Sequence, residues 1–399
     1  MKIEDYKKAV SRMHTRPELK MEVMKMSEEK AKKKFSRKAV IPIAIAATVC
    51  LSTLTAVFAE DIVGFFRKTN NLEMNISEDV SSEEITSMSI KKAIRKKWDE
   101  DTIKNLFMGD KSIAKDETYE SNYDSDMDRK FIEFQDGSRL GYEDGDLNWE
   151  YGDWLNYSYS YHISLLENLN FEKSSGKTPF KEADIEGLDK NECAALADSY
   201  VEQLGISVNG KQIFTFDKES LISEDVGRNE NGERIYKHGE VLPEWTEEQE
   251  AYLFVYNICA DDVSLTLSGE INTAGKLEIV VGRNGLASFE ARKILDPVED
   301  IETVNICPAE NAADAVYKFF EKEPSGSPMK IENYKLVYRT EGVDEEGIYF
   351  LKPCWEFYST AFVTWTNPDG TQNEGFEKGY IINVDPQTEE VIKNVINMP

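Results

Sequence analysis

Histidine and the common catalytic motifs are scarce in this sequence. The 399 residues contain three histidines, His14, His162 and His238, and none belongs to an HExxH sequence or another metal-ligand spacing. No GxSxG sequence, which would carry a serine nucleophile, is found either. We therefore expect no metal, no cofactor and no catalytic residues, so that the protein is not an enzyme. A hydrolase stays an alternative only if the fold brings together a nucleophile or a metal site.

Cysteine is also rare, with five residues in the chain. Cys50 lies inside an apolar run, and the spacings of 66, 48 and 47 residues between Cys193, Cys259, Cys307 and Cys354 match no compact disulfide framework. We expect Cys193 and Cys354 to be small apolar core residues. A single disulfide among the four stays open.

Two short stretches depart from ligand-binding loops. "SSGKT" at 174–178 has Phe171 where a phosphate loop needs glycine. "DSDMD" at 124–128 is followed by Arg129 where a calcium loop needs glycine, and Gln135 stands in place of the bidentate glutamate. Loose calcium binding by this acidic surface stays open, although an ordinary solvated face is the favoured interpretation.

Positive charge is scarce overall and unevenly placed. Lys and Arg number 47 against 75 Asp and Glu, a net charge of −28. Residues 1–38 hold 13 basic and 6 acidic residues, a net charge of +7, and the rest of the chain has a net charge of −35. So negative a surface repels phosphate and excludes nucleic acid as a partner of the larger part. The asymmetry is typical of a membrane protein with a basic cytoplasmic end.

One apolar segment separates the two charge regions. Ala39 to Ala59 is 21 residues without a charged side chain, and a helix of that length covers about 31 Å, close to a ~30 Å hydrocarbon core. A basic run ends at Lys38, directly before the segment, and Glu60 and Asp61 follow it. We expect a transmembrane helix in a lipid bilayer, with the N-terminus in the cytoplasm and the C-terminal domain extracytoplasmic. Signal-peptide cleavage after Ala59 is the alternative, and the long N-terminal flank disfavours it.

The first 38 residues carry two short amphipathic patterns with apolar residues three or four positions apart. Their apolar residues are Ile3, Tyr6, Val10 and Met13 in the first pattern and Leu19, Val23 and Met26 in the second. Helices of this length are marginal alone. They favour either docking to a cytoplasmic partner or contact with the membrane surface as a basic orienting tail.

The order "EDYKKAV…HTRPELKMEVM…KKK…RKAVIPIAIAATVCLSTLTAVFA" resembles the start of clostridial, Gram-positive membrane proteins encoded beside extracytoplasmic-function sigma factors. The resemblance covers about 60 residues. It implies an anti-sigma-like cytoplasmic element, a single span and a large outer domain, with a sigma factor as partner. His14 stands alone and Cys50 lies inside the span, so the zinc site of zinc-containing anti-sigma factors is not expected here.

After the span, Phe65, Phe66, Arg67 and Lys68 suit the membrane–water interface. Ser81 and Glu84 have the spacing of a capping box, which predicts a helix that begins at Ser81 and continues through Leu106. That helix would carry the dense basic run of residues 91–97. Such a run is able to touch anionic lipid, but pairing with nearby acids is the favoured interpretation.

The rest of the sequence predicts an α+β fold. Strands rich in Tyr, Trp and Phe alternate with turns at Asp136-Gly137 and Asp144-Gly145, and their aromatic residues favour a sheet core over a sugar- or peptide-binding groove. Helices over 187–206 and 308–322 are each followed by strands. This order predicts two tandem similar units, each an antiparallel sheet packed by a helix, and is loosely similar to YycH/YycI-type and PepSY-like regulators.

The sequence therefore predicts a membrane-anchored regulatory protein whose outer domain senses or binds an unknown extracytoplasmic ligand. The alternative is an envelope-binding protein whose N-terminus serves only as an anchor. The expected parts are a cytoplasmic region 1–38, a transmembrane helix 39–59, a juxtamembrane and helical connector 60–110, an aromatic-rich β region 111–180, and α+β units 181–298 and 299–399.

Overall fold

The structure is a computed structural model, and it describes twelve stretches of the chain. They are residues 66–68, 72–75, 85–120, 128–152, 162–163, 180–225, 227–235, 241–265, 275–322, 327–344, 347–366 and 372–392. The predicted span over 39–59 lies outside them. Within the described stretches, no helix is both long enough and apolar enough to cross a membrane.

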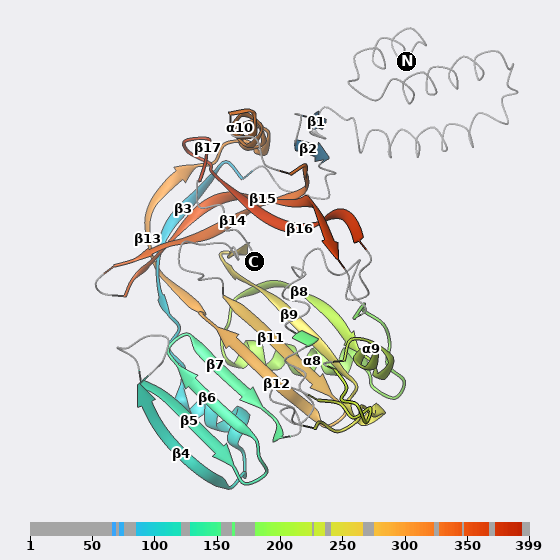
Figure 1. Cartoon of the computed structure of the whole chain (residues 1–399). Helices are drawn as coiled ribbons and strands as arrows, with labels where there is room; N and C mark the ends of the chain where they lie inside the picture. The colour runs from blue at the N-terminus through green and yellow to red at the C-terminus, as the bar shows by residue number, and fades with distance from the viewer. Residues whose placement is uncertain are drawn as a thin grey trace, which may run out of the picture. The chain divides into compact units, whose positions relative to one another are not determined.

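The described chain is α+β and mainly β, with two largely antiparallel sheets and few helices (Figure 1). This agrees with the predicted fold class at that level. The helices are α4 (Glu100–Ile103), η2 (Lys104–Met108), α8 (Lys190–Gln203), α9 (Lys218–Ser223), η4 (Glu247–Gln249) and α10 (Ala309–Lys322). The strands are β1 (Phe66–Lys68), β2 (Leu72–Asn75), β3 (Ser87–Arg95), β4 (Ile113–Glu120), β5 (Asp128–Phe134), β6 (Arg139–Glu143), β7 (Asp146–Glu150), β8 (Val208–Phe216), β9 (Ala251–Ala260), β10 (Val263–Ser264), β11 (Lys276–Gly282), β12 (Gly285–Arg292), β13 (Leu295–Asn305), β14 (Met329–Val343), β15 (Tyr349–Thr366), β16 (Gln372–Asp385) and β17 (Glu390–Val391).

The nine-stranded sheet has the order β10-β9-β11-β12-β7-β6-β5-β4, with β8 also paired to β9 (Figure 1). The predicted turns at Asp136-Gly137 and Asp144-Gly145 join β5 to β6 and β6 to β7, and both glycines have the positive φ that such turns need. Strands β7 and β12 are hydrogen-bonded neighbours. The aromatic-rich strands before residue 150 and the strands after residue 208 therefore belong to one sheet.

Helix α8 packs on one face of this sheet, against β9, β11 and β12 (Figure 1). Asp189 caps its first turn, since the Asp189 carboxylate accepts hydrogen bonds from the backbone N–H groups of Asn191 and Glu192 at 2.7 and 3.1 Å. Its buried side chains, Cys193, Ala197 and Val201, are four positions apart and lie on one side of the helix. Helix α8 thus covers one face of the sheet with small side chains that allow close approach.

The main core lies between α8 and the sheet. Phe107, from η2, is central to it, with ring centroids 5.8 Å from Trp149 and 5.5 Å from Phe289. Trp149 and Trp355 are both buried, as predicted for core aromatic residues. Cys193 and Cys354 are buried free thiols, which confirms their prediction as small apolar residues.

The eight-stranded sheet has the order β1-β2-β14-β15-β16-β17, and β3 pairs with both β13 and β15. The pairing of β2 with β14 is parallel. Contacts divide the chain into two compact units, one of Met1–Glu83, Ala313–Tyr334 and Tyr358–Lys378, the other of Glu84–Ala312, Lys335–Phe357 and Gly379–Pro399. The predicted second helix is confirmed as α10, and its buried residues are Ala312, Ala313, Val316 and Phe320.

The predicted helix from Ser81 through Leu106 is wrong over most of its length. Residues 87–95 form the strand β3, and helix is confined to the short elements α4 and η2 after the Asp99 cap. Met88 and Ile90 are buried at alternate positions, which is a strand period. The decisive partner is β13, more than 200 residues away in sequence, whose acids pair with the lysines of β3. Long-range pairing therefore overrides the local capping signal.

The basic run pairs with acids, as the favoured interpretation predicted, although from a strand. Lys91 is 5% exposed and bridges Asp261 at 2.5 Å and Asp300 at 2.6 Å. Burial would lower the pKa of Lys91, but hydrogen bonds to these two carboxylates raise it above its ordinary value. Lys91 therefore stays charged and joins β3 to β13 and to the β9–β10 turn.

We expect Lys91→Ala to lower the free energy of unfolding by about 1–3 kcal/mol, because it removes a buried charge pair and the stem that covers apolar surface. The neighbouring Lys92 is the matched control. It pairs with Glu299 from a more exposed position, so Lys92→Ala should cost at most about 1 kcal/mol. Thermal and urea unfolding of the two variants measure the difference. Equal losses would contradict a special role for Lys91.

A second, smaller core surrounds His162. The ring of His162 packs edge-on against Phe180 and Trp245, and its Nε2 lies 3.2 Å from the carbonyl oxygen of Leu221. Burial lowers the pKa of His162 to about 4, an effect only partly offset by that carbonyl and by Asp225. The neutral ring is therefore part of the folded state.

The unfolded chain binds this proton near pH 6.5 and the folded chain only near pH 4, so His162 should make stability fall as pH drops through that window. The loss attributable to it should be about 3 kcal/mol. Unfolding midpoints measured from pH 7 to pH 4 should fall less steeply in His162→Phe. An unchanged slope in that variant would show that other groups cause the dependence.

Candidate functional site

Most residues that the sequence predicts to be functional lie outside the described stretches. These are Ile3, Tyr6, Val10, Met13, Leu19, Val23, Met26 and Phe65. Phe66, Arg67 and Lys68 form β1, which pairs with β2. Their interfacial role stays a prediction.

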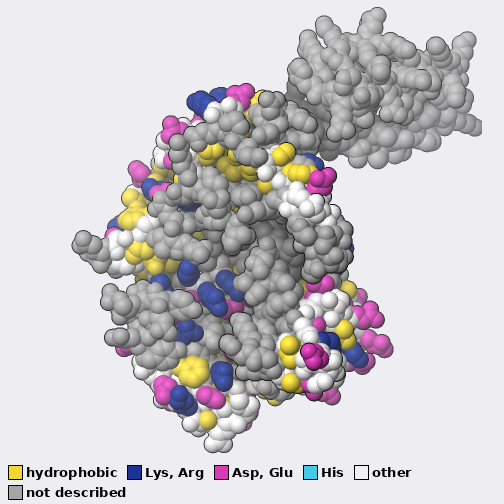
Figure 2. Space-filling view, in the orientation of Figure 1, with side chains coloured by type: hydrophobic (Ala, Val, Ile, Leu, Met, Phe, Trp, Pro, Cys, Tyr) yellow, Lys and Arg dark blue, Asp and Glu magenta, His cyan; other side chains and the backbone are white. Residues whose placement is uncertain are grey.

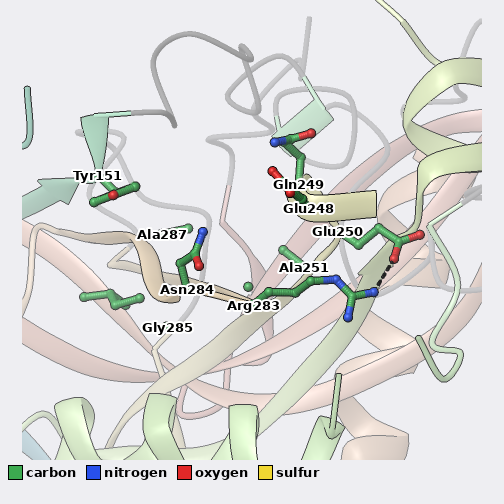
Figure 3. Close-up of a pocket in the computed structure, with 11 residues that line it drawn as sticks. Tyr151, Glu248, Gln249, Glu250, Ala251, Arg283, Asn284, Gly285 and Ala287 are labelled. Atoms are coloured by element: carbon green, nitrogen blue, oxygen red, sulfur yellow. Dashed lines mark hydrogen bonds and ion pairs between the residues drawn. The ribbon is translucent and has the colours of Figure 1, made fainter. Parts of the chain in front are cut away.

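A small pocket lies where the β11–β12 turn meets η4 (Figure 3). Its volume of about 50 Å³ has room for only a few water molecules, at ~10–15 Å³ each. Arg283 at its rim binds the Glu250 carboxylate and the carbonyl oxygen of Glu186, both at 2.8 Å. The hydrogen bonds of Arg283 to Glu186 and Glu250 join separate segments of the chain. Because the Arg283 guanidinium is already bound to protein oxygens, we do not take this small pocket as a substrate site.

A second feature is the face of the nine-stranded sheet opposite the α8 core. Polar residues occupy alternate positions of β5, β6, β7, β11 and β12, and the cross-strand register brings them to one side. Figure 2 shows Lys and Arg side chains gathered over β7, β11 and β12. We call this set the charged face. It consists of Arg129, Glu133, Arg139, Glu143, Asp146, Asn148, Glu150, Lys276, Glu278, Ser288, Glu290 and Arg292.

The β11–β12 half of the charged face is internally paired. Lys276 Nζ lies 3.0 Å from Glu278 Oε2 and 2.8 Å from Glu290 Oε2, and Arg292 also pairs with Glu290. Burial by itself would raise the pKa of Glu290, but Lys276 and Arg292 more than offset it and hold that pKa below the ordinary value. Glu290 is therefore a firmly ionised carboxylate.

The β6–β7 part is different. Arg139 and Glu150 stand directly opposite each other in the register, yet no ion pair joins either of them to another described residue. The Nε atom of Arg139 is buried and makes no hydrogen bond to any described group. Burial raises the pKa of Glu150, and the nearby Glu290 adds to that rise. Two adjacent polar groups of opposite charge are thus left partly desolvated.

Arg129 spans the neighbouring strands above Gly141. Its Nη2 donates to Asn148 Oδ1 at 2.6 Å, and its Nη1 lies 3.6 Å from Glu143 Oε1. A Cβ at Gly141 would come within 2.5 Å of Asn148 Oδ1, so glycine leaves room for this pair. The Glu143 side chain is 1% exposed, and neither of its carboxylate oxygens makes a hydrogen bond to a described group. The pairing network is incomplete here as well.

Chemically, the charged face offers donors and acceptors in close alternation. Glu150 and Glu290 lie on adjacent strands with pKa values moved in opposite directions. No group of three or more His, Cys, Asp or Glu side chains that would suit a metal ion occurs in the described stretches. Burial raises the pKa of all four described cysteine thiols, which disfavours thiolate chemistry. Recognition of a polar ligand is the chemistry that this surface supports best.

The charged face was not predicted from the sequence, although its strands carry a visible pattern. In "RLGYE" at 139–143 and "DLNWE" at 146–150, apolar residues alternate with polar ones, and the same holds for "SFEAR" at 288–292. Alternation predicts that each strand has one polar side. It does not say that these polar sides share one sheet face.

Comparisons with known proteins concern the fold alone. No protein-family model and no curated protein sequence matches the chain. The crystal structure of an uncharacterized protein from Eubacterium rectale ATCC 33656 is similar, with a TM-score of 0.58 and 13% sequence identity. The similarity covers 82% of this chain and 92% of that one. It therefore extends over nearly the whole of that protein's chain.

The opposed pKa directions of Glu150 and Glu290 can be tested through Lys276. We expect Lys276→Met to raise the pKa of Glu290, because it removes a cation 2.8 Å from the carboxylate. Carboxyl-detected NMR titration of both glutamates measures this. Lys104→Met, which removes an exposed lysine paired with Glu100, should leave both titrations unchanged. An unaltered Glu290 in Lys276→Met would contradict the pairing.

Proposed function

We propose that this chain is a single-pass membrane protein that restrains a sigma factor on the cytoplasmic side and binds a ligand with its outer domain. The observation that carries the proposal is the charge asymmetry about one apolar segment. Residues 1–38 carry +7, residues 39–59 carry no charge, and the remainder carries −35. Basic residues retained in the cytoplasm beside a segment long enough to span the bilayer give this orientation.

The cytoplasmic part of the proposal rests on the two amphipathic patterns. The apolar faces that include Tyr6, Val10, Leu19 and Val23 are too short to be stable helices alone. They would fold against the sigma factor and sequester it, in a manner similar to anti-sigma proteins. Methionines at positions 13 and 26 would adapt to the partner surface. A signal received outside, or proteolysis, would release the factor.

For the outer domain we propose binding and not catalysis. Its charged face presents paired and incompletely paired polar groups on a rigid sheet, which suits recognition. This same observation favours the second candidate function, an envelope-binding protein whose N-terminus is only an anchor. We further propose that 181–298 and 299–399 are similar units, because α8 and α10 each precede a run of mainly antiparallel strands.

The orientation is tested by adding a protease to intact protoplasts that contain the full chain. We expect the outer domain to be digested and a fragment that contains residues 1–59 to be protected. A released outer fragment that begins at Glu60 would show cleavage after Ala59 and contradict the anchor. A fully protected chain would contradict the proposed outer location.

Docking is tested by isolating the full chain from native membranes and identifying a co-purifying sigma factor. Val10→Asp places a charge on the proposed apolar face and should reduce the retained factor at least about tenfold. Ser11→Asp adds the same charge off that face and should retain it. Equal retention by both variants, or no sigma factor with the unmodified chain, would leave the N-terminus as an anchor only.

A further inference from the structure

The charged face carries both signs of charge in close alternation. Its four cations, Arg129, Arg139, Lys276 and Arg292, stand with six carboxylates, Glu133, Glu143, Asp146, Glu150, Glu278 and Glu290. A ligand that contacts this face therefore meets both signs at short range.

The two halves of the charged face differ in what they leave unpaired. Lys276 bridges Glu278 and Glu290 at 3.0 and 2.8 Å, so this half is satisfied from within. Arg139 and Glu150 face each other across neighbouring strands without an ion pair between them. Directly opposed side chains start about 5 Å apart at Cβ. A small polar group of a ligand fits between two such side chains.

Buried polar atoms near Arg139 and Glu150 also lack hydrogen-bond partners in the described chain. The Nε atoms of Arg129 and Arg139 and both carboxylate oxygens of Glu143 are buried and lack hydrogen bonds to the described chain. Leaving such groups unpaired is costly, on the order of 1–3 kcal/mol each. Glu143 is the most deeply placed of them, with its side chain 1% exposed. Strand β6, which carries Arg139, Gly141 and Glu143, is thus the centre of the incomplete network.

A hydroxyl group matches this arrangement better than a charged group. One hydroxyl accepts hydrogen bonds and also donates one, so it can accept from the Arg139 guanidinium and donate to the Glu150 carboxylate at once. A phosphate or carboxylate would satisfy Arg139 and repel Glu150, and an ammonium group would do the reverse. Bonds to charged partners are also stronger than neutral ones. A neutral ligand with several hydroxyls should therefore bind this site more tightly than an anionic or a cationic ligand.

An aromatic ring completes the surface. Phe131 stands opposite Gly141 in the register, which places it on the same side of the sheet as Arg139. The Phe131 side chain is half-buried, and an exposed aromatic face packs well against the apolar C–H face of a ring compound. An apolar platform beside charged donors and acceptors is a suitable combination for a polyhydroxylated ring.

We propose that the charged face binds an uncharged saccharide, with its hydroxyls between Arg139 and Glu150 and a sugar ring against Phe131. The inference rests on the proposed outer location of this domain, where such ligands are encountered, and it is independent of sigma-factor docking. One hydroxyl site and one ring contact give few interactions, so we expect a weak affinity, with a Kd of about 1 mM.

The test is calorimetric titration of the purified full chain in nanodiscs with three neutral tetrasaccharides, namely chitotetraose, cellotetraose and maltotetraose. We expect at least one to bind. Arg139→Met and Glu150→Met should each weaken binding about tenfold or more, because each removes one side of the hydroxyl site. Both variants should fold, since an apolar side chain replaces a partly buried, unpaired group. Lys104→Met, which removes an exposed lysine that pairs with Glu100 and does not belong to the charged face, is the matched control and should bind as the unmodified chain does.

Several results would overturn the inference. One is that none of the three saccharides binds up to 20 mM, on the order of twenty times the expected Kd. Another is that Arg139→Met, Glu150→Met and the unmodified chain bind equally. Binding of hexaglutamate or hexalysine in place of the saccharides, with loss in Arg139→Met or Glu150→Met, would assign the face to charged peptides instead. If a variant has a lower Tm, Glu150→Gln, which keeps the size and removes the charge, replaces it. Retention of a sigma factor is measured separately, so failure here leaves the proposed function standing.

Discussion

The nine-stranded sheet has one apolar face and one partly ionisable face, and much of the described structure depends on this difference. Helix α8 and the core side chains take one face, where Trp149 and Phe289 lie next to each other in the register. On the other face, β8, β9 and β11 contribute Phe214, Leu253 and Val280 to the smaller core around His162. Strands β6, β7 and β12 carry ionisable groups at alternate positions of that face. Because a buried carboxylate is costly without a partner, these groups must compensate one another across strands. Lys276, between Glu278 and Glu290, shows how this is done.

The same rule governs the pairing of β3 with β13. One strand is basic and the other acidic, and their register places Lys91 opposite Asp300 and Lys92 opposite Glu299. Lys91 also reaches Asp261 in the β9–β10 turn. Charge that looks excessive in one part of the sequence is therefore complementary to charge elsewhere in the chain. In β3, the local excess of lysine therefore reflects pairing with acids of the same chain.

Where charged side chains of the sheet lack ion-pair partners, we propose that a ligand binds. Arg139 and Glu150 are opposed without an ion pair between them, and Glu143 is buried with only a distant contact to Arg129. A sheet holds such groups at fixed spacing, so a ligand meets them preorganised. The proposed docking helices at the N-terminus would work in the opposite way, because helices this short would become stable only on binding. One chain would thus combine a rigid outer surface with an adaptable cytoplasmic one.

The sequence by itself determined the α+β class, the helix α8, the Asp-Gly turns of the β5–β7 meander and the burial of Cys193 and Cys354. Each of these follows from signals within about 20 residues, such as a helical period, a cap or a turn pair. Only the tertiary structure decided that residues 87–95 are a strand, because their partner β13 lies more than 200 residues away. It alone also placed Arg139, Glu150 and Glu290 on one face, since strand register between distant segments depends on packing that no local pattern encodes.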